Sequence, residues 1–210
     1  ILGDMTPSNA SASLTIFAAD HGIAAQRVSA FPQEVTGQMV ANFLAGGAAA
    51  NVIAAQFDIP VTVVDCGIAH PPRRRDGLID LSLGGGTADS STGPAMSPET
   101  ARKAIAQGRH FACGIESKIV CFGEMGIANT SAAALLAHKL SGISVAELVG
   151  RGTGLDDTAL SHKQDVLERA AARTGALAPI EALADLGGFE IGTMAGAMVG
   201  AGTSNKLVVV

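Results

Sequence analysis

Residues 121–131 combine the residue types that ligand chemistry needs. The stretch holds one carboxylate, Glu124, close to Gly123 and Gly126, and it ends in Asn129-Thr130-Ser131. An apolar run precedes it and an alanine-rich segment follows, so we expect a strand-to-helix turn. Open parallel sheets bind ligands at such turns, where backbone amides can face an anion. Helix capping explains the three polar residues but not a carboxylate in a glycine-flanked turn, so we predict a ligand site.

A second candidate follows the glycine-rich stretch Gly152-Thr153-Gly154. Residues 157–174 predict a long helix with an apolar stripe, and Lys163 lies on that stripe between Leu160 and Leu167. An ammonium on a buried stripe requires an anion or a route to water. A helix N-terminus, exposed amides and an inward ammonium together are typical of a phosphate pocket. The alternative is a lysine that extends to the surface.

Three other loops carry weaker signals. Asp20 and His21 follow a predicted strand, and ligand contact and a local turn explain them equally well. Phe31 could wall a flat apolar ligand and Gln38 could hydrogen-bond to it, although a hydrophobic staple at a helix start explains Phe31 at least as well. Residues 84–91 are rich in Gly and Ser and suit a mobile loop or a ligand lid.

Composition narrows the class of protein. The 210 residues carry a formal net charge of −5, with seven Phe and neither Trp nor Tyr, which argues against a nucleic-acid surface. No apolar run reaches the length of a membrane span, so we expect no membrane partner. No signal peptide is evident. The cysteines, which are odd in number and lack metal-binding spacing, indicate free thiols, a cytoplasmic location and no metal site; they are Cys66, Cys113 and Cys121.

Strands and helices alternate along the chain, which predicts an α/β fold. The predicted strands are Leu14–Ala18, Val61–Asp65, Lys118–Phe122 and Leu207–Val210, with Leu78–Leu83 a weaker fifth. The predicted helices are Val35–Leu44, Ala48–Phe57, Pro98–Phe111, Ser131–Leu140, Asp157–Thr174, Pro179–Asp185 and Ile191–Val199. We therefore expect a three-layer αβα fold, in which helices cover both faces of a mostly parallel, Rossmann-like sheet.

The two ends bear on domain organisation. The chain opens on Ile1 rather than Met, and its last strand is followed by no helix to cover the sheet. We expect residues 1–210 to form a single α/β domain, the central portion of a longer enzyme. The basic run Arg73-Arg74-Arg75 is interpreted as a solvated loop tip.

Taken together, these segments resemble the family of nicotinate-nucleotide–dimethylbenzimidazole phosphoribosyltransferases. The likeness covers nearly the whole chain, in order. The matching stretches are Phe17–Gly22, Val28–Pro32, Met39–Ala49, Phe122–Thr130, Gly152–Asp156, Gly187–Ile191 and Met194–Met198.

The resemblance implies a pentosyltransferase of cobalamin biosynthesis. Such an enzyme transfers the phosphoribosyl group of nicotinate mononucleotide to 5,6-dimethylbenzimidazole or a similar base, and releases α-ribazole 5′-phosphate and nicotinate. The resemblance also implies a homodimer that uses no metal and no cofactor. By motif, the implied phosphate- and nucleotide-binding residues are Gly126, Asn129, Thr130, Ser131, Gly152, Thr153, Gly154 and Lys163. The implied base-binding residues are Phe31, Gln38 and Met125.

One departure from the family pattern concerns catalysis. The family's general base is a glutamate in a glycine-rich motif near the C-terminus, and these 210 residues contain no such motif. The resemblance therefore implies that Glu124 is a supporting carboxylate, and that the base and most of the family's small helical domain are absent from this chain. A non-catalytic nucleotide-binding fragment is the alternative function. A nicotinamide-dinucleotide oxidoreductase is disfavoured because residues 18–22 are not a dinucleotide fingerprint.

Overall fold

The computed structural model describes residues 11–73 and 76–210 and contains a parallel sheet of five strands. The strand order is β3-β2-β1-β4-β5. The strands are β1 (Ala12–Ala19), β2 (Val61–Gly67), β3 (Leu78–Asp80), β4 (Ile119–Met125) and β5 (Leu207–Val209). Each lies on one of the five predicted runs, and every pairing is parallel, so the predicted sheet is confirmed. The sequence predicts a solvated loop tip at residues 73–75, and two of these residues, Arg74 and Arg75, lie outside the described residues.

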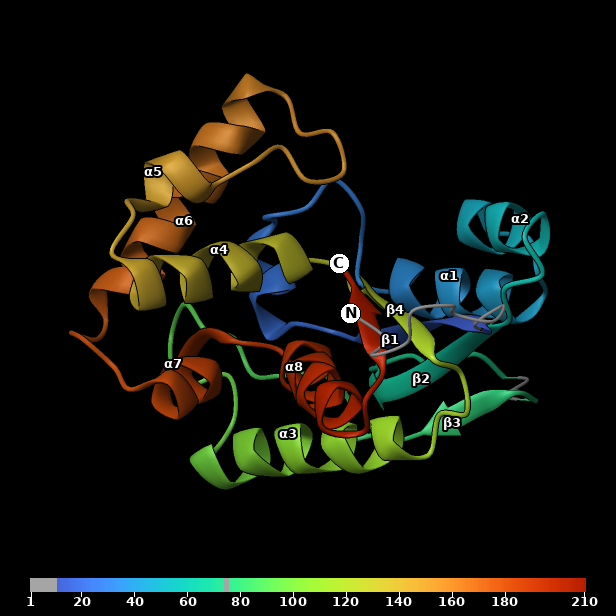
Figure 1. Ribbon diagram of the computed structural model, residues 1–210. Coiled ribbons are helices and arrows are strands. Elements are labelled where there is room, and N and C mark those ends of the chain that lie inside the picture. The colour runs from blue at the N-terminus through green and yellow to red at the C-terminus, as the bar shows by residue number, and fades with distance from the viewer. Residues whose placement is uncertain (1–10, 74–75) are drawn as a thin grey trace.

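Helices cover both faces of the sheet (Figure 1). One face carries α1 (Val35–Leu44), with α2 (Ala49–Ala55) beyond it. The other face carries α8 (Phe189–Thr203), and α3 (Pro98–Cys113) packs on the outside of α8. The α3–α8 contact is close because glycines line it: a Cβ at Gly108 would lie 1.8 Å from the Thr193 carbonyl oxygen. This arrangement is the three-layer αβα fold that the sequence predicts.

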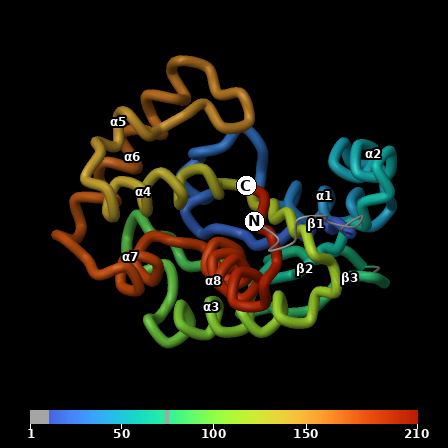
Figure 2. The backbone as a smooth tube through the Cα atoms, in the orientation of Figure 1, coloured from blue at the N-terminus to red at the C-terminus, as the bar shows by residue number. Residues whose placement is uncertain are grey.

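A helical lobe lies beside the sheet and carries part of the site (Figure 2). It consists of α4 (Asn129–Ser141), α5 (Val145–Leu148), α6 (Asp157–Ala172) and α7 (Pro179–Leu186). Its apolar cluster, which includes Leu135, Val166 and Leu167, is separate from the cluster around Phe17 that fills the space between the sheet and α8. The 3-10 helix η1 (Gly22–Gln26) joins the lobe to the end of β1 and adds Ile23 to the lobe's cluster.

The strand β4 is longer than predicted, and this changes the setting of Glu124. Hydrogen bonding with β1 continues until Phe17 pairs with Glu124 and Ala18 pairs with Met125. Glu124 therefore stands at the end of a strand, and the prediction of a glycine-flanked turn around it was wrong. The turn proper is limited to Gly126-Ile127-Ala128.

The prediction that no apolar run reaches the length of a membrane span does not hold for one stretch of the described residues, Val35–Ala55, whose length and mean hydropathy (1.3) are those of such a span. A single such segment near an N-terminus is weak evidence for a membrane, because helices of soluble proteins pass the same test. In this fold the stretch forms two helices, α1 and α2, which are separated at Gly46, where φ is +77°.

Candidate active site

The site lies at the topological switch point of the sheet, between β1 and β4, where the strand order reverses. From β1 the sheet grows to β2 and β3 on one side and to β4 and β5 on the other. Ligands of open α/β sheets bind at such a switch point, outside the carboxyl ends of the strands. Here those ends present Asp20 and His21 after β1, and Glu124 and Met125 at the end of β4. The topology thus brings together two segments that the sequence identified separately.

Lys163 is buried, and its ammonium points toward the start of α4. The residue is 1% exposed, and its Nζ donates to Thr130 Oγ1 at 2.9 Å and to the Gly150 carbonyl at 3.1 Å. Burial lowers the pKa of Lys163. No carboxylate in the described part of the chain pairs with this ammonium, so one of its three N–H donors remains available. The alternative of a lysine extending to the surface is therefore wrong.

Helix α4 begins without a side-chain cap, although three polar residues stand at its start. Within the described residues no side chain caps the helix at Ala128, which has a left-handed backbone with φ of 73°. Asn129 donates to Glu190 instead, and Thr130 accepts from Lys163. The Ser131 hydroxyl is buried and finds no partner among the residues that the structure places. Capping thus does not account for these residues. The Asn129 and Ser131 amides donate to the Gly126 and Ala128 carbonyls, so the described residues leave the Thr130 amide and the Ser131 hydroxyl open to a ligand.

The N-terminus of α6, by contrast, is already occupied. The Asp156 carboxylate accepts from the Ala159 amide at 2.8 Å, and Arg151 pairs with Asp157 in the first turn. A helix end capped by one carboxylate does not attract a second anion. The expectation that Lys163 serves the N-terminus of its own helix was therefore wrong, because its side chain crosses to α4.

The glycines of the site allow close approach of backbone and side chains. A Cβ at Gly126 would lie 2.3 Å from the Ala19 carbonyl oxygen, so only glycine allows the end of β4 to turn against the end of β1. A Cβ at Gly152, where φ is +52°, would lie 3.5 Å from Lys163 Nζ. Gly154 has φ of +104° and open space beside it. The 150–154 loop therefore lies directly over the ammonium.

A second loop reaches the 150–154 loop from the other side (Figure 2). The Ser29 hydroxyl lies 3.4 Å from the Thr153 hydroxyl and accepts from the Phe31 amide at 3.3 Å. Phe31 is 49% exposed, and its ring is free to contact a ligand. The structure therefore places Phe31 and Thr153 on adjoining loops.

The other predicted base-binding residues lie on α1 and β4. Met125 packs against the apolar cluster that includes Val40 of α1. The Ile127 amide donates to Thr36 Oγ1 at 3.1 Å, which joins the start of α1 to the β4–α4 turn. Gln38 is exposed one turn farther along, and its side chain forms no hydrogen bond in residues 11–73 and 76–210. Its amide is therefore available to a ligand.

Glu190 is the site residue that sequence reasoning did not single out. It is completely buried, and its Oε1 accepts from Asn129 Nδ2 at 2.7 Å and lies 2.7 Å from His21 Nε2. Burial alone would lower the pKa of His21, but the charge and hydrogen bond of Glu190, together with the charges of Glu124 and Asp20, raise that pKa. A carboxylate two residues after Gly187-Gly188 was a signal in the sequence, but nothing there showed that it meets His21. Asp20 is also buried, and its Oδ2 accepts from the Ala69 amide at 2.8 Å.

Glu124 has the electrostatics of a group that exchanges protons near neutrality. Partial burial and the negative charge of Glu190 raise the pKa of Glu124 to about 7, although His21 opposes the shift. A carboxyl with such a pKa can act as an acid or as a base at physiological pH. Its carboxylate form also supplies negative charge close to any cationic transition state at this edge.

The 84–91 loop closes one side of the site, and hydrogen bonds fix it. Thr87 Oγ1 accepts from the Gly22 amide at 3.2 Å, and Asp89 accepts from Gln26 at 2.7 Å. Both partners belong to η1. These contacts describe a fixed wall next to the β1 end, so neither a mobile loop nor a lid fits the segment.

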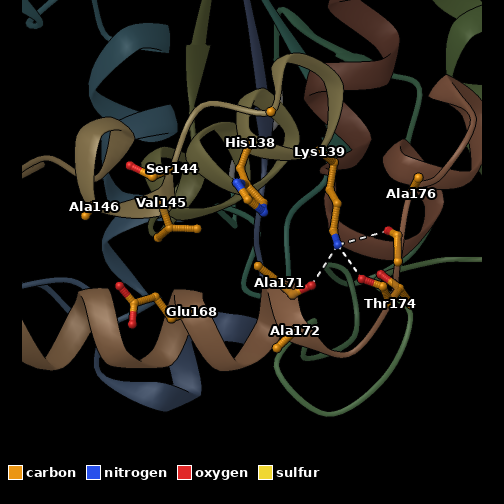
Figure 3. Close-up of a pocket in the computed structure, with 12 residues that line it drawn as sticks. His138, Lys139, Ser144, Val145, Ala146, Glu168, Ala171, Ala172, Thr174 and Ala176 are labelled. Atoms are coloured by element: carbon orange, nitrogen blue, oxygen red, sulfur yellow. Dashed lines mark hydrogen bonds between the residues drawn. The ribbon is translucent and has the colours of Figure 1, made fainter.

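A separate hollow of about 510 Å³ lies between the C-terminal half of α4 and the end of α6 (Figure 3). Its lysine, Lys139, donates to three carbonyl oxygens, those of Ala171 at 2.7 Å, Thr174 at 2.5 Å and Gly175 at 3.1 Å. These contacts use all three donors of the ammonium. The lysine there satisfies the end of α6, so we do not place the ligand in this hollow.

Within the described residues, neither the cysteines nor the potential metal ligands form a second functional site. All three cysteines are free, and burial raises the pKa of Cys66, so its thiol stays protonated. Among the residues that the structure describes, no three His, Cys, Asp or Glu side chains are grouped to hold a metal ion.

Comparison with known proteins defines the class. A family model described as phosphoribosyltransferase matches residues 1–210. A relative in Variovorax paradoxus is 46% identical over the whole chain, and one in Aromatoleum aromaticum is 52% identical over 89% of it. Both are named nicotinate-nucleotide–dimethylbenzimidazole phosphoribosyltransferase. The chain belongs to this family, as its motifs indicated.

Solved structures agree with the fold. The crystal structure of CobT from Thermus thermophilus matches 96% of the chain with a TM-score of 0.90 and 39% identity. The chain covers 62% of that structure, and it covers 60% and 55% of the two relatives named above. It thus spans about three fifths of the length of the proteins that it matches.

Proposed function

We propose that this chain carries the nucleotide-binding part of an enzyme that transfers phosphoribosyl from nicotinate mononucleotide to 5,6-dimethylbenzimidazole or a similar base. The products are α-ribazole 5′-phosphate and nicotinate, in cobalamin biosynthesis. One observation carries the proposal: the buried ammonium of Lys163 has a donor to spare beside the open N-terminus of α4. A phosphate monoester dianion fits that arrangement, because it accepts from an ammonium, a hydroxyl and backbone amides at once.

The phosphate subsite consists of residues from two loops and from the helices α4 and α6. Lys163, Thr130 and Gly152 adjoin one another, and Gly126, Asn129, Ser131, Thr153 and Gly154 complete the subsite on either side. Phosphate bound there directs the ribose toward the ends of β1 and β4. The base then lies against Met125, with Phe31 and Gln38 as its outer contacts.

The chemistry is a displacement at the anomeric carbon. The bond from C1′ to the pyridinium nitrogen breaks and its electrons leave with nicotinate, while a benzimidazole nitrogen forms the new bond from the opposite face. The transition state has oxocarbenium character, and the Glu124 carboxylate stabilises that positive charge. The attacking base also loses its N–H proton, and a positioned carboxylate that receives it contributes about 10²–10⁴-fold. We assign Glu124 a supporting part in these steps and propose a cytoplasmic homodimer for the whole protein.

The test is a transfer assay with nicotinate mononucleotide and 5,6-dimethylbenzimidazole, paired with calorimetric titration of the nucleotide. We expect Glu124→Gln to bind nucleotide as the wild type does and to lose most of the transfer rate in a protein that turns over. Binding without turnover by the wild-type chain supports the alternative of a non-catalytic nucleotide-binding fragment. Binding of NADH in place of the mononucleotide would indicate an oxidoreductase and contradict the proposal.

A further inference from the structure

Glu190 joins three segments that line the site. Its carboxylate, which comes from the first turn of α8, meets His21 after β1 and Asn129 at the start of α4 through the same oxygen, Oε1. The residue is completely buried. Burying a carboxylate is unfavourable unless it is paired and hydrogen-bonded. The position of the Glu190 carboxylate therefore depends on His21 and Asn129, and the positions of those two side chains depend on Glu190.

The backbone at Gly188 packs closely against this carboxylate and the His21 ring. A Cβ at Gly188 would lie 2.4 Å from His21 Cε1 and 2.6 Å from Glu190 Oε2. Glycine at the residue before α8 is therefore what allows the ring and the carboxylate to meet. A side chain packed so closely transmits its position to its partners.

Asn129 connects this cluster to the phosphate subsite. It is the first residue of α4, and the next residue, Thr130, accepts from Lys163. We propose that Glu190 is a positioning residue: through Asn129 and His21 it fixes the open N-terminus of α4 against the end of β1, and so sets the geometry in which the nucleotide phosphate is bound. This inference rests on the proposed function and adds a residue to it.

The electrostatics of the neighbouring groups support this role. The charged groups that face Glu124 and shift its pKa are Glu190 and His21. The charged groups that face His21 are Glu190, Glu124 and Asp20. The charge of Glu190 raises the pKa of both Glu124 and His21. Burial has the largest effect on both pKa values, and a neutral residue of the same volume at position 190 would keep that burial but remove the effect of the charge.

The test compares Glu190→Gln with the wild-type chain in calorimetric titration with nicotinate mononucleotide. We expect affinity to fall about 10- to 100-fold, the loss typical of one hydrogen bond to a charged group. We also expect the Glu124 carboxyl, followed by NMR, to titrate at a lower pH than in the wild type, because the charge of Glu190 contributes to its raised pKa. Asp185→Asn is the matched control, because Asp185 is a buried carboxylate 2.9 Å from the Arg173 guanidinium and outside the site. It should destabilise the fold and leave both readouts unchanged.

Three outcomes overturn the inference. The first is an affinity within twofold of the wild type together with an unchanged Glu124 midpoint. If Glu190→Gln does not melt cooperatively, Asn129→Ala takes its place, because it frees α4 and keeps the His21–Glu190 contact. Retained affinity for the nucleotide in Asn129→Ala is the second outcome. A wild-type chain that binds no nucleotide contradicts the proposed function instead. Amide hydrogen exchange of residues 126–131 then decides: exchange about tenfold faster in Glu190→Gln supports positioning, and unchanged exchange excludes it.

Discussion

The two ends of α4 differ in how completely their polar groups are satisfied. At the C-terminal end, Gly142 adopts a left-handed backbone and its amide donates to the His138 carbonyl at 2.9 Å, while the three donors of Lys139 all meet carbonyls. At the N-terminal end, Ser131 lacks a partner in the described part of the chain and Lys163 keeps a free donor. A lysine links each end of α4 to the region of α6: Lys139 of α4 at the C-terminal end and Lys163 of α6 at the N-terminal end. The difference shows that an unsatisfied cation, rather than the presence of a lysine, marks the binding end.

Glycine substitutions at the two ends give the largest expected contrast. Gly126→Ala places a Cβ 2.3 Å from a backbone oxygen and should lower the free energy of unfolding by about 3 kcal/mol or more. Gly142→Ala meets no described atom within 4 Å, so it should cost only the left-handed strain of about 1–2 kcal/mol. Urea denaturation of both variants measures the difference. Equal losses would show that the β4–α4 turn is not tightly packed.

The lysine at the satisfied end should matter for stability alone. Lys139→Met removes a donor from three carbonyls and should lower the free energy of unfolding by about 1–3 kcal/mol. We expect the affinity for nicotinate mononucleotide to stay within twofold of the wild type. A large loss of affinity in this variant would move the ligand to the hollow between α4 and α6.

Glu124 at the binding end should make stability depend on pH. Its pKa rises from 4.5 to about 7 in the folded state, so the folded state favours the protonated carboxyl. The stability that this group contributes is complete below about pH 4.5 and is lost as the pH rises through about 7. Melting temperatures of the wild type and Glu124→Gln, measured between pH 4 and 8, should therefore diverge in favour of the variant. Parallel curves would place the carboxyl in ordinary solvent.

The smallest effect is expected at Phe31, on the outer edge of the site. Because its ring is half exposed, Phe31→Ala should change the free energy of unfolding by less than about 0.5 kcal/mol. It should weaken binding of the benzimidazole by about 2- to 10-fold through loss of an aromatic contact. Phe57→Ala, at a more exposed ring after α2, is the control and should leave base affinity unchanged.

The sequence predicted those parts of the molecule that depend on local pattern. Apolar runs located all five strands, α1 has the predicted bounds, and the spacing of Lys163 correctly indicated burial. The end of β4 was missed because pairing with β1 extends it through Glu124. Glu190 was missed because its meaning depends on His21, 169 residues away in the chain, and no local pattern reports such a contact.

Calorimetric titration of Lys163→Met with nicotinate mononucleotide tests the central claim most directly. Loss of a buried charge-assisted contact to phosphate should weaken affinity by about 30- to 1000-fold. The fold should stay at least as stable as the wild type, because the substitution removes a buried charge that no carboxylate in the described residues balances. Affinity within twofold of the wild type in a folded Lys163→Met variant would contradict the account.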